Sequence, residues 1–306
     1  MTRTGLSCLV VVSLLLASAA VSLRAQVSVE VVFEQDQDQF LRGEAIKAGV
    51  RITNLSGRTL HFGEDDDWLT FTVQSREGSV VARVSDVPVR GGFNVESASR
   101  ATRKVNIQPY FNLNQTGGYA VVANVRIKEW NQAKKTEPKS FYVIEGAKLW
   151  EQDFGVVNAK SVEATNTPPE VRKYTLQQVN YLKDHLRLYL RVSDQTGARI
   201  FNTVPVGQIL SFSHPEPQID KSSNLHLIYQ SWAKVYSYSV FSPDGELVKR
   251  ETYDYIATRP RLQVDKDGLV GVVGGVKREK PATDNAESGA GSQGKAAGEM
   301  QAAARK

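Results

Sequence analysis

Val27-Ser28-Val29-Glu30-Val31-Val32-Phe33, near the start of the chain, alternates apolar and polar side chains with a period of two residues. Residues 48–52, AGVRI, show the same period. Successive side chains of an extended strand point to opposite faces, so this pattern is typical of a strand with one buried face. About eight such segments, separated by turn residues, follow one another up to residue 144. Together they predict an antiparallel β-sandwich over residues 26–155.

The same module contains GEAI (43–46), VRITNLSG (50–57) and WLTFTV (68–73). The order of a Gly-Glu pair, a valine-led strand and Asn-x-Ser-Gly resembles the immunoglobulin-like modules of bacterial exported proteins, including the BsuPI-type proteinase-inhibitor family. This resemblance covers the first half of the module and implies an immunoglobulin-like sandwich. The cysteine pair and tryptophan spacing of antibody domains are missing.

The C-terminal part of the chain contains an internal repeat. PEPQIDK (215–221) is echoed by PRLQVDK (260–266), and each copy is followed by a turn and an apolar strand. A period of 40–45 residues resembles that of β-propeller blades, and FSPDG (241–245) resembles the hairpin of blade repeats. At most three units fit, whereas a propeller needs at least about four. We therefore expect an antiparallel β-meander of blade-like repeats over residues 171–278, with closure by another chain as the alternative.

Three other segments are assigned from composition. Residues 1–25 carry Arg3, an apolar stretch over 6–20 and Ala25 before the expected cleavage point, which together indicate a signal peptide. Residues 156–170 are polar and contain two adjacent prolines, so we expect a linker there. Residues 279–306 have one large apolar side chain, Met300, and are expected to be a disordered tail.

The signal peptide implies a secreted or periplasmic protein with no membrane span after cleavage; an uncleaved anchor is the alternative. Cys8, the single cysteine, lies inside the signal, so the mature chain cannot form a disulfide or a thiolate metal site. Removing Arg3 and Arg24 from 38 basic residues leaves 36 against 33 acidic ones, a net charge of +3. This weak balance does not favour a nucleic-acid partner.

No constellation of residues specifies a reaction. The G-x-S-x-G elbow is absent, and Ser231 and Lys234 match S-x-x-K without its companion motifs. We therefore predict no enzyme and no cofactor, although paired carboxylates of a glycoside hydrolase stay open because the fold places them. No zinc or other metal site is predicted, since the histidines of the mature chain lack the close pairs of zinc sites; these are His61, His185, His214 and His226.

Two acidic segments could be taken for metal loops. Glu64-Asp65-Asp66-Asp67 has the oxygen ligands that calcium prefers, or it is a solvated turn that discourages edge pairing. Residues 265–268, DKDG, have a repeat counterpart, DKSS at 220–223, that lacks the second carboxylate. For this repeated turn we predict an aspartate that binds its own backbone.

Aromatic residues concentrate in the C-terminal module. Tyr236 and Tyr238 share a strand face with Val240, which predicts burial. Trp232 and Tyr255 have polar neighbours, so we expect them at the surface as possible ligand-binding residues. The full set is Tyr229, Trp232, Tyr236, Tyr238, Phe241, Tyr253 and Tyr255.

These observations predict an exported, non-catalytic binding or scaffolding protein of the cell envelope or extracellular space, with a protein or glycan partner. One alternative is a carbohydrate-binding protein or a degenerate relative of propeller-type glycan-active proteins. Another is a proteinase inhibitor acting through the N-terminal module. Because a fold does not determine function, these hypotheses rest on analogy.

Overall fold

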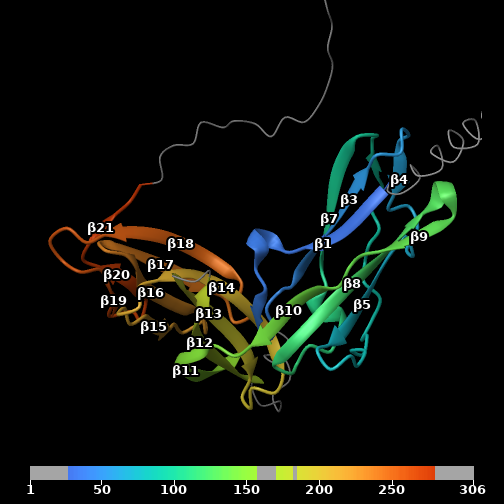
Figure 1. The fold of residues 1–306 in the computed structure, drawn as a ribbon. Coiled ribbons are helices and arrows are strands. Elements are labelled where there is room, and N and C mark those ends of the chain that lie inside the picture. Colours follow the sequence, from blue (N-terminus) through green and yellow to red (C-terminus); the bar gives the residue numbers. More distant parts are fainter. Residues whose placement is uncertain (1–26, 157–169, 182–184, 280–306) are drawn as a thin grey trace, which may run out of the picture.

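The computed structural model describes residues 27–156, 170–181 and 185–279 (Figure 1). Within these ranges the regular structure is β throughout, apart from three 3₁₀ turns, so the predicted all-β class is confirmed. The predicted signal peptide lies outside the described residues, as do 157–169 of the predicted linker and 280–306 of the predicted tail.

The N-terminal module has two main sheets that enclose one core. The first contains β1 (Val27–Val32), β3 (Lys47–Asn54) and β7 (Ser99–Asn106). The second contains β2 (Gln39–Leu41), β10 (Lys139–Ile144), β8 (Gly117–Ile127) and β5 (Leu69–Ser75), with β9 (Gln132–Lys135) beside β8. A short pair, β4 (Leu60–Phe62) and β6 (Phe93–Val95), completes the module.

Alternation along the strands produces this core. On β8, Val121, Ala123, Val125 and Ile127 are fully buried, while the residues that alternate with them are partly exposed. Phe40 and Phe141 pack edge to face, with ring centroids 6.1 Å apart. Burial of this kind stabilises a chain by about 25 cal/mol per Å² of apolar surface, so packing can hold the module together without disulfides.

The C-terminal module consists of a four-stranded antiparallel sheet, a five-stranded antiparallel sheet and a further hairpin. The first sheet is β11 (Ala147–Val156), β12 (Glu170–Tyr181), β13 (His185–Asp194) and β14 (Ile200–Ile209). The second is β15 (Glu216–Ile219), β16 (Leu225–Trp232), β17 (Val235–Phe241) and β18 (Leu247–Asp254). The hairpin is β19 (Arg261–Val264) with β20 (Val270–Val273), and β21 (Val276–Lys277) pairs with β18. The described residues form no closed propeller.

The boundary between the modules differs from the expected one. β11 pairs with β12 through nine residue pairs, so residues 157–169 connect two strands of one sheet. The modules instead meet between β10 and β11, near Glu145 and Gly146. A polar, proline-containing segment has the same composition whether it joins domains or strands, and β11 itself shows no clear alternation of buried and exposed residues.

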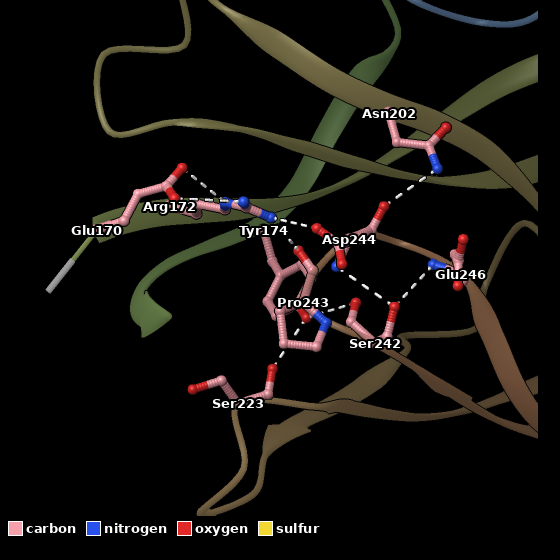
Figure 2. A network of polar contacts seen from close by, with 9 residues as sticks. All are labelled: Glu170, Arg172, Tyr174, Asn202, Ser223, Ser242, Pro243, Asp244 and Glu246. Atoms are coloured by element: carbon pink, nitrogen blue, oxygen red, sulfur yellow. Dashed lines mark hydrogen bonds and ion pairs between the residues drawn. The ribbon is translucent and has the colours of Figure 1, made fainter. Parts of the chain in front are cut away.

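The two sheets of the C-terminal module share a core, and polar contacts at one end align them (Figure 2). Tyr174 of β12 is fully buried and stacks on Phe154 with centroids 4.0 Å apart. Its hydroxyl lies 2.9 Å from the carbonyl oxygens of both Ser223 and Ser242, to either of which it can donate. Both carbonyls belong to turns of the second sheet, so one side chain connects the sheets.

The turn of residues 242–245, between β17 and β18, is held by the first sheet as well. Arg172 donates to the Asp244 carboxylate at 2.6 Å and also pairs with Glu170 at 2.9 Å. The Asn202 amide donates to the carbonyl of Asp244 at 3.2 Å. Figure 2 shows these side chains converging on the turn. The segment that resembles a blade hairpin is therefore part of the contact between the sheets.

The repeated aspartates behave as predicted. The Asp220 carboxylate accepts backbone N–H groups of Ser222 and Asn224, both at 2.8 Å. Asp265 accepts those of residues 267 and 269 at 2.9 and 2.8 Å. An aspartate that binds its own backbone stabilises a tight turn, so the two copies share one turn structure.

We predict that Gly245→Ala lowers the free energy of unfolding more than Gly197→Ala. Both glycines have positive φ, 78° and 76°, so alanine costs about 1–2 kcal/mol at either position. A Cβ at Gly245 would also lie 3.0 Å from Val192, whereas one at Gly197 meets nothing within 4 Å. Because of this overpacking, we expect Gly245→Ala to lower the free energy of unfolding by about 1 kcal/mol more than Gly197→Ala does. Chemical denaturation measures both values. Equal losses would contradict the close packing of this turn on the first sheet.

Candidate functional site

Trp232 and Tyr255 lie at the surface, as their polar neighbours predicted. Trp232 ends β16 and is 56 % exposed, and Tyr255 follows β18 and is 41 % exposed. The backbone N–H of Tyr255 donates to the carbonyl of Lys234 at 2.8 Å. This bond places the residue after β18 beside the hairpin loop that Trp232 enters.

A third connection reaches the same end of the second sheet. Leu210 donates its backbone N–H to the carbonyl of Gln230 at 3.2 Å, and the Gln230 N–H donates to the Ser213 hydroxyl at 3.2 Å. This segment carries Phe212, which is 70 % exposed, and the connection after β18 carries Ile256, which is 71 % exposed. We call Phe212, Trp232, Tyr255 and Ile256 together the apolar loop surface.

Sequence reasoning missed two of these four residues. Phe212 stands alone among serines and a histidine, and Ile256 lies between a tyrosine and an alanine, so no period marks either as exposed or buried. The remaining aromatic residues of the module are mostly inside: Tyr236 and Tyr238 are 5 % and 4 % exposed, as predicted. Burial raises the pKa of Tyr253, whose ring packs edge to face on Tyr238, to about 12.

The apolar loop surface has basic but no acidic neighbours within its own connections. Residues 210–215, 232–235 and 255–260 contain Lys234 and Arg259 and no carboxylate. Arg259 pairs with Glu216 at 2.8 Å and lies over the ring of Tyr236. Lys234 is exposed at the tip of the hairpin between β16 and β17. The arrangement suits a partner with an apolar surface and negative charge.

A second feature is the joint between the two modules. Glu44 and Thr203 form a β-bridge between the segment after β2 and strand β14. The Thr203 hydroxyl donates to the Arg42 carbonyl at 2.9 Å. Gly43 lies so close to β14 that a Cβ there would come within 2.5 Å of Ile200. The Gly-Glu pair of the N-terminal module is thus part of the contact with the C-terminal module.

Glu44 is 6 % exposed, and its carboxyl group has several hydrogen-bond donors around it. The Leu41 N–H donates at 2.8 Å, the Gln37 amide at 3.2 Å, and the Tyr189 hydroxyl at 3.3 Å. Burial outweighs these bonds and raises the pKa of Glu44 above its ordinary value. Burial raises the pKa of Tyr189 too. These contacts connect the two modules through Glu44 and occupy its carboxyl oxygens with donors of the chain itself.

Clefts lie on both sides of Glu44. One of 540 Å³ is lined in part by Asp36, Asp38 and Asn180. The other, of 260 Å³, is lined in part by Lys47 and Arg187. Ligands often bind where modules meet, and the carboxylates of the first cleft would attract a cation.

A polar cluster supports the same joint. Glu145 accepts from Arg191 at 2.6 Å and from Gln177 at 2.9 Å, and the Arg42 guanidinium lies 3.9 Å away. Burial opposes ionisation of Glu145, but the bonds from Gln177 and Arg191 prevail and lower its pKa. Arg191 is buried, and a buried charge is costly to separate from its partner, so this cluster opposes movement of one module against the other.

The acidic loop is occupied by ion pairs. Glu64 contacts Lys128 at 3.2 Å, Asp65 and Asp67 contact Arg126 at 3.2 and 2.5 Å, and Asp66 pairs with Arg90. In the described part of the chain, no group of three or more histidine, cysteine or acidic side chains is arranged to hold a metal ion. Calcium would have to displace these cations to bind here.

Two further candidates, His226 and Ser231, have structural partners. His226 is buried between Tyr238, 2.8 Å from Nδ1, and Asp220, 3.2 Å from Nε2. The Ser231 hydroxyl lies within the sheet, where it donates to the Val235 carbonyl at 3.3 Å and accepts from Ser237. These bonds tie the module's turns and strands together.

No protein-family model matches the chain, and no curated protein shows significant similarity to it. Among the described residues, no helix has the length and apolar character needed to cross a membrane.

We predict that Glu44→Gln changes the pH dependence of stability. A carboxyl group with a raised folded-state pKa contributes stability that is full below its unfolded pKa, near 4.5, and is lost as pH rises through the folded value. The variant, which does not titrate, should therefore gain stability relative to the wild type as the pH rises from below 4.5 through the raised pKa of Glu44. Denaturation at several pH values measures this, with Glu77→Gln, on an exposed turn, as control. A difference between wild type and variant that is independent of pH would contradict it.

Proposed function

We propose that the chain is an exported, non-catalytic binding or scaffolding protein of the cell envelope or extracellular space, which recognises its partner through the apolar loop surface. The observation that supports this proposal most directly is the gathering of four exposed apolar side chains on neighbouring connections. Exposed apolar groups in soluble proteins are usually scattered, and a gathered set is typical of an interaction site. The apolar stretch of residues 6–20 supports export.

The scaffolding part of the proposal is supported by the joint between the modules. Glu44 and Glu145 both have partners on either side of it, and Gly43 contacts β14 closely. A joint with these contacts presents the two modules in one orientation. We propose an immunoglobulin-like N-terminal sandwich and blade-like C-terminal units as the two folds that are held in this way.

A carbohydrate partner is the second candidate function, favoured by the exposed rings of Trp232 and Tyr255. Such rings can stack on a sugar face. Proteinase inhibition by the N-terminal module is a third hypothesis and is tested with a broad protease panel. Turnover that is unchanged across the panel would dispose of it.

We predict that Trp232→Ala lowers capture of the native partner about tenfold or more, because a large apolar side chain at the centre of a contact carries much of its free energy. Capture from native envelope extracts and binding to a glycan array are the measurements. The control is Leu269→Ala, since Leu269 is 66 % exposed but lies in the turn between β19 and β20, at the opposite end of the module. Unchanged capture by the Trp232 variant would refute recognition through this surface, and a sugar signal lost in that variant would favour the carbohydrate function.

A further inference from the structure

The apolar loop surface projects from connections instead of lining a hollow. Phe212 and Ile256 are the most exposed of its residues, at 70 % and 71 %. Five clefts of the described residues, including those beside Glu44, are lined by none of its four side chains. A small ligand would remain largely in water on such a surface, whereas a broad apolar phase would cover all four side chains at once.

The residue types indicate which phase this is. Ile256 and Phe212 gain most from hydrocarbon, while Trp232 and Tyr255 combine an apolar ring with a polar group and favour the membrane–water interface. A sugar would stack on the two polar-edged rings but would gain little from Ile256. The mixture of aliphatic and interfacial aromatic residues therefore favours a bilayer over a glycan.

The charges of the same connections agree with this choice. Lys234 lies at the tip of the hairpin that follows Trp232, and the three connections contain no carboxylate. A lysine near a negatively charged bilayer is attracted to it, and its long apolar stem lets the ammonium group reach the headgroups while the neighbouring side chains insert. Glu216 and Asp254, the acids that directly flank these connections, are paired with Arg259 and Arg278.

We propose that the apolar loop surface docks the chain on a bilayer with anionic headgroups. Phe212 and Ile256 enter the acyl boundary, Trp232 and Tyr255 lie at headgroup level, and Lys234 contacts the phosphates. The turns of Asp220 and Asp265 both lie at the end of the strands that is opposite to the apolar loop surface. In this orientation both turns point away from the bilayer. This inference rests on the proposed function, because it names the partner of the same surface.

Vesicle flotation tests the docking. Residues 26–306 retain every contact described above and omit the apolar stretch of residues 6–20, which would itself bind lipid. The probes are vesicles of phosphatidylcholine alone and of phosphatidylcholine mixed with phosphatidylglycerol. We expect binding to the mixed vesicles and a loss of about tenfold for Phe212→Ser and for Ile256→Ser, because each removes a large apolar side chain from the acyl boundary. Leu269→Ser, equally exposed at the opposite end, should bind as the wild type does.

Two further readouts separate insertion from general stickiness. Lys234→Glu should lower binding to the mixed vesicles and leave binding to neutral vesicles unchanged, because it reverses a charge and keeps all four side chains of the apolar loop surface. The fluorescence of Trp232, obtained as the difference between wild type and Trp232→Phe, should shift to the blue on binding. Thermal denaturation shows whether each variant is folded. Leu269→Ser serves as the control for the general effect of replacing an exposed apolar side chain with serine.

The outcomes are distinct. Equal flotation of Phe212→Ser, Ile256→Ser and the wild type would overturn the docking, as would an unshifted Trp232 emission. If vesicles are not bound but Trp232→Ala still loses a captured envelope protein or sugar, the bilayer inference is overturned and the proposed function stands. If neither vesicle binding nor capture of a partner depends on Trp232, the bilayer inference and the proposed function are both overturned.

Discussion

Packing of the sheet β11–β14 on the sheet β15–β18 positions the connections described at both ends of the second sheet. Tyr174 is central to it, since its ring stacks on Phe154 and its hydroxyl reaches two turns of the second sheet. The turn of residues 242–245 is held at the same end by Arg172. With one end of the strands held in this way, the other end presents Phe212, Trp232 and the connection after β18 together.

The first sheet also carries the joint with the N-terminal module, so it is the middle layer of the described structure (Figure 1). Glu44 is unusual there, because a buried carboxyl group is costly to ionise. Its three donors offset part of that cost, and Arg187 adds a nearby positive charge. Burying a polar group in this way gives the interface a defined geometry, since a shifted interface would leave the carboxyl group without partners.

Several features could be read directly from the residues. Two-residue alternation predicted the β class and the burial of Tyr236 and Tyr238, and comparison of the two repeat copies predicted turns in which Asp220 and Asp265 bind their own backbone. These predictions depend on neighbours within a few positions. Strand β11 was missed because only its last residues alternate, and as an edge strand it is recognised by its pairing with β12.

The sequence by itself determined what local geometry controls: strands where side chains alternate, turns where aspartate and glycine recur, and exposure of Trp232 and Tyr255 among polar neighbours. Only the tertiary structure decided that Phe212 and Ile256 join them, and that Glu44 meets Tyr189 across 145 positions. The physical reason is that a side chain's partners across a sheet or an interface depend on how layers stack. The way in which the sheets stack depends on the packing of many residues from distant segments, so it cannot be predicted from any single segment of the sequence.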